Sequence, residues 1–149
     1  MMNSFRFACV TALALSLVAC AAQTDDAQND ERAQEELSSK VAHFETFEGA
    51  NGLYYFRLRA ANSQIQLTSD GYSSEAAVLG IVATAQSAGR STSNYDIHQA
   101  SNGEYAVNLL GWDGTHVAKG ELYSTKSSAT RAVNGMATTL SHKVAIISK

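Results

Sequence analysis

The amino-acid sequence predicts an α+β fold in which tandem duplicated β3-α-β units share one antiparallel sheet, with two helices on one face of it. Three observations lead to this prediction. The stretch 44–86 aligns without a gap with 95–137, at an offset of 51 residues. Each copy passes from a two-residue alternation of apolar side chains to a helical spacing. One copy of about 50 residues can hardly bury a core alone, whereas two copies that share a sheet can.

The identities between the copies lie at expected turns and core positions. Asn51, Gly52, Tyr54, Leu58, Tyr72, Ser73 and Val82 align with Asn102, Gly103, Tyr105, Leu109, Tyr123, Ser124 and Val133. We expect strands at 44–48, 54–60 and 64–69 in the first copy, and at 95–99, 105–110 and 115–120 in the second. Asn-Gly before the second strand of each copy predicts a hairpin, because both residues tolerate a positive φ.

A helix is expected after the third strand of each copy. Ser73 or Ser74, and later Ser124 or Thr125, are suitable N-caps. The first helix is expected to bury Ala77, Val78, Ile81, Val82 and Ala85, and the second Ala129, Ala132, Val133, Met136, Ala137 and Leu140, one stripe at helical spacing. The apolar, β-branched segment 143–148 predicts a final strand.

The first 19 residues have the features of an export signal. Arg6 precedes an uncharged apolar run at 7–19, which is shorter than an ordinary membrane-spanning helix. Leu17-Val18-Ala19-Cys20 resembles the bacterial lipobox, which implies lipidation of Cys20 and cleavage before it. The alternative is an ordinary cleavage site at Ala19-Cys20-Ala21, which would release a soluble secreted protein. For a Gram-negative organism, the sorting rule of enteric bacteria indicates the outer membrane, since Asp does not follow Cys20.

Residues 20–42 are interpreted as the lipidated cysteine and an acidic, flexible tether. Between 21 and 40 lie six acidic residues and two basic ones, whereas 41–149 carries eight of each. The excess negative charge of the chain, −3 in total, therefore belongs to the tether. The domain itself has no strongly basic character, which together with the export signal argues against a nucleic-acid partner.

The stretch 55–74, YFRLRAANSQIQLTSDGYSS, closely resembles the signature of the YegP-like domain of unknown function. That signature has an aromatic strand, then L-K-A-A-N-G-Q-I, then S-E-G-Y and a small-residue helix start. The resemblance covers 43–149, with one repeat at 43–93 and the other at 94–149. In the second repeat Gly111-Trp112-Asp113-Gly114 replaces Ala60-Ala61-Asn62-Ser63, and His116 replaces Ile65. The resemblance implies two β3-α-β units in one sheet with exchanged C-terminal strands, and no established activity.

No arrangement of residues in the sequence indicates catalysis. The four histidines lack a partner at metal-ligand spacing, and no nucleophile or phosphate-binding motif occurs. We therefore expect no enzyme activity, no metal and no cofactor.

The open face of the predicted sheet is the best candidate for a partner surface. Alternation places Tyr55, Arg57 and Arg59 there, and the second copy adds Leu110 and Trp112, with Val117 on the neighbouring strand. Two alternatives remain open. The face is an ordinary solvated surface, or the chain bends at Gly111 so that Trp112 folds over an edge of the core.

The predicted function is that of a lipid-anchored, monomeric protein of the cell envelope, at the outer membrane and facing the periplasm. It would act as a non-catalytic binding or structural module for an envelope protein or polymer. The alternative is a soluble secreted or periplasmic enzyme or ligand-binding protein with an unrecognised site.

Overall fold

The computed structural model describes residues 41–149. The predicted signal peptide (1–19), Cys20 and the acidic segment up to residue 40 lie outside the described residues. The elements are β1 (His43–Glu48), β2 (Tyr54–Arg59), β3 (Ile65–Thr68), α2 (Glu75–Ala88), the 3-10 turn η1 (Thr92–Asn94), β4 (Tyr95–Gln99), β5 (Tyr105–Leu110), β6 (His116–Tyr123), α3 (Lys126–Ser141) and β7 (Ala145–Ser148).

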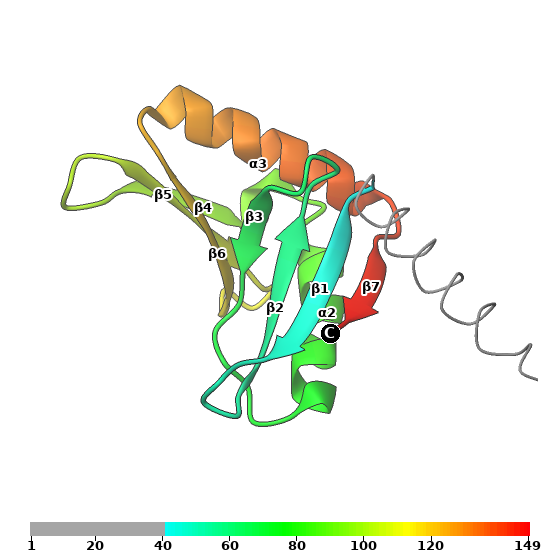
Figure 1. The fold of residues 1–149 in the computed structure, drawn as a ribbon. Coiled ribbons are helices and arrows are strands. Elements are labelled where there is room, and N and C mark those ends of the chain that lie inside the picture. The colour runs from blue at the N-terminus through cyan, green and yellow to red at the C-terminus, as the bar shows by residue number, and fades with distance from the viewer. Residues whose placement is uncertain (1–40) are drawn as a thin grey trace, which may run out of the picture.

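All strands belong to one seven-stranded sheet in the order β4-β5-β6-β3-β2-β1-β7. Two helices, α2 and α3, pack against one face of it and share its hydrophobic core (Figure 1). The predicted α+β class, with one sheet and two helices, is confirmed. Among the described residues, no helix combines the length and the apolar character needed to cross a membrane.

The sheet consists of two three-stranded meanders that meet at its centre. β1, β2 and β3 pair antiparallel in the first, and β4, β5 and β6 in the second. The meanders are joined by β3 and β6, which pair at Thr68 and Lys119. The two residues of this pair are 51 positions apart in the chain.

The predicted antiparallel sheet is wrong at one edge. β7 pairs with β1 in parallel, with Phe44 opposite Ile146. An apolar, β-branched run identifies a strand but does not specify its partner. Here α3 crosses the sheet before the chain returns, so that β7 arrives at the free edge of β1 and runs in the same direction as β1.

Each meander contains a β-bulge at the same relative position. Gln66 has no partner between the pairs Leu58–Leu67 and Arg59–Ile65, and Val117 has none between Leu109–Ala118 and Leu110–His116. Val117 is 1% exposed and belongs to the core. Its predicted place on the open face is therefore wrong, because the bulge interrupts the simple alternation of side chains.

The Asn-Gly hairpins form as predicted but by a different local mechanism. Gly52 and Gly103 have positive φ (73° and 86°), whereas their neighbours Asn51 and Asn102 do not. Each asparagine side chain instead accepts a hydrogen bond from the backbone amide two residues later. The side chain of asparagine, rather than its tolerance of positive φ, stabilises these turns.

The helices begin at two of the predicted caps. The hydroxyl of Ser74 accepts from the amide of Ala77, and that of Thr125 from the amide of Ser128. The buried stripe of α3 is the predicted one, with Ala132 only partly buried.

In the core, the rings of Phe44 and Phe56 meet edge to face with centroids 5.5 Å apart. The core therefore fills the space under one face of the sheet and leaves the other face open.

Candidate binding surface

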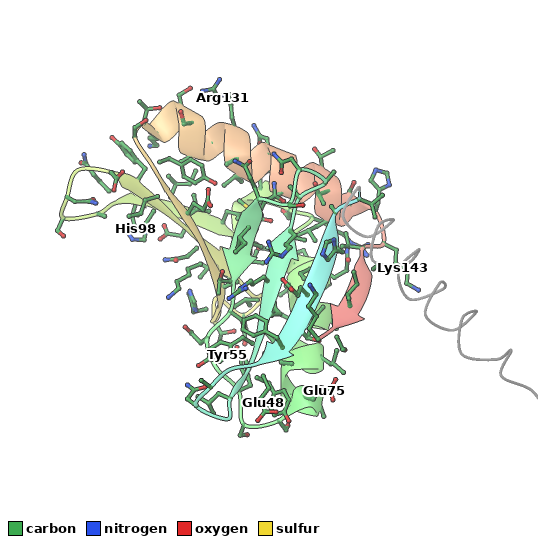
Figure 2. The ribbon with its side chains drawn as sticks, in the orientation of Figure 1. Glu48, Tyr55, Glu75, His98, Arg131 and Lys143 are labelled. Carbon is green, nitrogen blue, oxygen red and sulfur yellow. The ribbon has the colours of Figure 1, made fainter. Side chains whose placement is uncertain are left out.

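The predicted residues of β2 lie on the face of the sheet that the helices do not cover. Phe56 and Leu58 are fully buried in the core, so that the alternating residues Tyr55, Arg57 and Arg59 point to the opposite side. Figure 2 shows Tyr55 on this part of the sheet and Arg131 on α3, well away from it. We call the side opposite the helices the open face.

Two aromatic rings and a guanidinium group form a stack on the open face. The rings of Phe47 and Tyr55 have centroids 5.7 Å apart and are inclined by 20°. The guanidinium carbon of Arg57 lies 4.2 Å from the centroid of the Phe47 ring. A cation over an aromatic ring contributes about 0.5–1 kcal/mol at an exposed site. The stack therefore holds Arg57 in a defined position while the edges of its guanidinium group stay available.

Two glycines make room for the Tyr55 ring. A Cβ atom at Gly71 would lie 2.8 Å from the hydroxyl oxygen of Tyr55, and one at Gly49 would lie 2.8 Å from its Cε2. The side chain of Asn51 donates a hydrogen bond of 2.8 Å to the same hydroxyl. Tyr55 is thus fixed by packing and by a polar contact. In the second meander, 51 residues later, its place is taken by Ala106.

Arg59 takes part in a different structure, an ion cluster around the buried carboxylate of Glu45. The Glu45 side chain is 6% exposed, and its carboxylate accepts from Arg59 Nε at 2.6 Å and from Lys149 Nζ at 3.3 Å. Burial raises the pKa of Glu45, but the hydrogen bonds from Arg59 and Lys149 outweigh it and leave the pKa below its usual value. Arg59 also donates to the carbonyl oxygen of Ser63. Arg59 is therefore engaged in holding the fold.

Strand register aligns polar residues in one row across the open face. From β1 to β4 the directly paired residues are Glu45, Arg57, Thr68, Lys119, Asn108 and Asp96. Within residues 41–149 neither Arg57 nor Lys119 forms an ion pair. The row therefore carries two free cationic groups near the centre of the sheet, with the Thr68 hydroxyl between them.

The other predicted residues, Leu110 and Trp112, lie in the second meander. Leu110 is on β5, three strand spacings or about 14 Å from β2. Trp112, in the turn between β5 and β6, is 67% exposed. The alternative in which Trp112 folds over the core edge is therefore wrong. The Asp113 carboxylate accepts from the amide and hydroxyl of Thr115, and these hydrogen bonds lower the pKa of Asp113.

Two small hollows lie on or beside the sheet. A hollow of about 130 Å³ lies at the junction of β3 and β6 and is lined by Ile65, Gln66, Thr68, Lys119, Gly120 and Glu121. A second hollow, of about 240 Å³, lies beside the C-terminal residues and the start of α2, near Glu48 and Glu75. No cluster of three or more potential metal-ligating side chains occurs between residues 41 and 149. These surfaces suit contact with a partner better than enclosure of a small substrate.

Several residues of this surface are not identified by the sequence reasoning. Phe47 and Lys119 alternate with core residues on their strands, so the sequence pattern could have placed them on the open face. Their place beside Arg57 depends on strand order and register, which the sequence does not specify. The same is true of His116 and Asp70, which come within 3.2 Å of each other from different meanders.

Comparison with known proteins identifies the family. The family model described as a domain of unknown function, DUF1508, matches residues 50–96 and 100–138. The chain belongs to the DUF1508 family. The predicted resemblance to the YegP-like domain is confirmed by this match together with the relatives and structures that carry the YegP name.

Two curated relatives each match more than half of this chain. The chain is 32% identical to the UPF0339 protein YegP of Yersinia pestis over 110 residues, which are 73% of this chain and 95% of that protein. It is 35% identical to the UPF0339 protein MS1092 of Mannheimia succiniciproducens over 86 residues, which are 58% of this chain and 76% of the relative.

Two solved structures share the fold. The solution structure of yegP from E. coli, a protein of unknown function, superimposes with a TM-score of 0.67 at 21% identity, over 73% of this chain and 93% of that one. That of the UPF0339 protein SO3888 from Shewanella oneidensis gives 0.65 at 18% identity, over 72% and 90%. At these identities the likeness concerns the fold alone.

Proposed function

We propose that this DUF1508 protein is a lipid-anchored, non-catalytic binding module of the cell envelope. Its open face would contact an envelope partner, and its N-terminus would attach to the outer membrane on the periplasmic side. Support for the anchor comes from the lipobox-like sequence that ends at Cys20. Support for binding comes from the open face.

The single observation that carries the binding proposal is the stack of Phe47, Tyr55 and Arg57. Its rings and guanidinium group are ordered by packing, yet Arg57 has no acidic partner among residues 41–149. An ordered aromatic and arginine cluster at the surface is typical of the anchors of protein interfaces, where Tyr and Arg are enriched. Gly49 and Gly71 leave room for the ring of Tyr55. A side chain that only faces solvent would not require this room.

The binding proposal is tested by photocrosslinking in intact cells. A photoreactive amino acid replaces Tyr55 in one strain and Arg131, on the far side of α3, in another. We expect a crosslinked product from position 55 and none from position 131. Equal products from both positions, or no product from position 55, would contradict the proposal.

The anchor proposal has its own experiment. In cells labelled with palmitate, Cys20→Ala should abolish incorporation of the label and leave the precursor uncleaved by the lipoprotein peptidase. Label in the variant, or no label in the wild type, would exclude lipidation at Cys20 and favour a soluble secreted protein.

We also infer that the two meanders with their helices are duplicated units that fold as one monomer. The row across the open face supports this inference, because Glu45, Arg57 and Thr68 have the same places in the first meander as Asp96, Asn108 and Lys119 in the second. Each of these pairs is 51 residues apart, and Thr68 faces Lys119, its own counterpart. In this proposal the two units are related by an approximate two-fold axis between β3 and β6.

The duplication is tested with one unit alone. A fragment spanning 41–93 leaves the inner edge of β3 unpaired, so it should be unfolded or dimeric. A monomeric fragment that unfolds cooperatively would contradict the requirement for two units.

A further inference from the structure

We propose that the open face binds a linear glycan whose sugar residues carry carboxylates. In this proposal Arg57 and Lys119 pair with the carboxylates, and the aromatic ring of Tyr55 packs against a sugar ring. The proposal rests on the proposed binding function and adds the chemical class of the partner.

Charge complementarity identifies the carboxylate. Three acidic groups around the row already have basic neighbours: Glu45 contacts Arg59 and Lys149, Asp96 contacts His98, and Asp70 contacts His116. Glu121 lines the same hollow as Lys119 but forms no ion pair with it. Arg57 and Lys119 are the cations of the row that form no ion pair with a described acidic group. They stand on β2 and β6, with β3 between them, so their backbones are about 10 Å apart. An anionic ligand across the row can therefore meet both groups, and a guanidinium edge binds a carboxylate with two parallel hydrogen bonds.

The position of the row favours a glycan over a peptide. Extended peptides gain affinity when they add to the free edge of a sheet and form main-chain hydrogen bonds there. β2 lies between β1 and β3, so its main chain is paired on both sides. A ligand on this part of the open face meets side chains alone. Hydroxyl-rich rings suit such a surface, because they use side-chain hydrogen bonds and ring packing.

The shape of the surface favours a polymer over a free sugar. Small-ligand sites are concave and enclose most of the ligand, typically in about 300–1,000 Å³. The hollow beside Thr68 and Lys119 measures about 130 Å³, less than a pocket of that class. Affinity on such a surface must therefore come from several shallow contacts along an extended chain. Tyr55, Arg57 and Lys119 are spread over the sheet in a way that provides them.

The experiment uses a soluble form that begins at residue 21 and retains every described residue. Polygalacturonate, a linear glycan with a carboxylate on each sugar, is titrated while the NMR signals of the open face are followed. Fully methyl-esterified polygalacturonate is the uncharged control, and poly-glutamate is the acidic peptide control. We expect binding of polygalacturonate alone, with shifts at Tyr55, Arg57 and Lys119.

Matched charge variants locate the contact. Arg57→Gln and Lys119→Gln should each weaken binding by about tenfold, the loss expected when a charge-assisted hydrogen bond is removed. Arg131→Gln, which removes the same charge from the exposed surface of α3, should leave the affinity unchanged. Urea unfolding of each variant checks that the fold is intact, and Tyr55→Phe should bind as the parent does while Tyr55→Ala should not.

The proposal is overturned by any of three results. These are no binding of polygalacturonate, equally tight binding of the esterified polymer, and equally tight binding of poly-glutamate. Each would leave the crosslink from position 55 in cells unaffected. Failure of the glycan proposal is therefore distinguishable from failure of the binding function itself.

Discussion

The side-chain carbonyl of Gln86, on α2, accepts a hydrogen bond of 3.0 Å from the backbone amide of Val144, 58 residues later in the chain. Its amide nitrogen donates to the carbonyl oxygens of Leu140 and His142 at 2.7 and 2.8 Å. One side chain thus satisfies three backbone groups where α3 ends and the chain turns towards β7. This contact connects the first helix to the path of the last strand.

We predict that Gln86→Ala lowers the free energy of unfolding by about 2 kcal/mol, because each of three hydrogen bonds contributes about 0.5–1.5 kcal/mol. Urea unfolding followed by circular dichroism measures the change. Gln99→Ala is the control: the side chain of Gln99 is exposed and donates one hydrogen bond, to Gly103, so its loss should change stability by less than about 0.5 kcal/mol. Equal effects of the two substitutions would show that Gln86 has no special role in the connection to β7.

The stability that Glu45 contributes should depend on pH. Its folded-state pKa lies below the usual 4.5, so the ionised carboxylate stabilises the fold fully above that value. The contribution is lost as the pH falls through the lowered pKa. Glu45→Gln should therefore cost about 1–2 kcal/mol at pH 7. The cost should decrease as the pH falls through the lowered pKa of Glu45. Denaturant titrations of both proteins at several pH values measure the difference in the free energy of unfolding. A difference that does not change with pH would show that the ion cluster is unimportant.

Trp112 provides a spectroscopic check on the exposed turn. It is the only tryptophan in the chain, so the emission reports on this residue alone. Because the side chain is 67% exposed, its spectrum should be that of a solvated indole and acrylamide should quench it readily. Trp112→Ala should change the free energy of unfolding by less than about 0.5 kcal/mol. A blue-shifted, unquenched spectrum in the monomer would mean that the ring is buried.

Two glycine substitutions should have different effects, because a new Cβ atom meets a side chain at one position and nothing at the other. Gly71→Ala places a Cβ atom 2.8 Å from the Tyr55 hydroxyl and should displace the ring, which the near-ultraviolet circular dichroism of tyrosine would detect. Gly80→Ala, in the middle of α2, meets nothing within 4 Å. It should raise the free energy of unfolding by about 0.5–1 kcal/mol, because alanine loses less backbone entropy in a helix. An unchanged tyrosine signal in Gly71→Ala would show that the ring has room to spare.

The local elements follow from the sequence because their causes are local. Alternation in 54–60 sets the inward and outward sides of β2, and the hydroxyls of Ser74 and Thr125 set the starts of the helices. The last strand is also correctly placed in the chain, at Ala145–Ser148. Its parallel pairing with β1 is not predictable in this way, because the partner of a strand depends on the route of the chain across the sheet.

The candidate surface is predicted only in part, for the same reason. Alternation identifies Tyr55 and Arg57 as open-face residues. The stack with Phe47 and the free cation at Lys119 depend on the register between strands that are distant in sequence. Val117 is misplaced because a bulge adds one residue, and Arg59 is engaged by Glu45, a partner 14 positions earlier.

The parallel pairing of β1 and β7 has a mechanical consequence. Residue 41 leads into the start of β1, and Lys149 follows the end of β7, so the two ends of the described chain emerge at opposite ends of the same strand pair. A pulling force between an N-terminal attachment and a load at the C-terminus would slide the strands along each other and strain their hydrogen bonds together. Pulling at two neighbouring ends would instead break such bonds one after another, at a lower force. Force between the two ends of the described chain therefore loads the β1–β7 edge in shear.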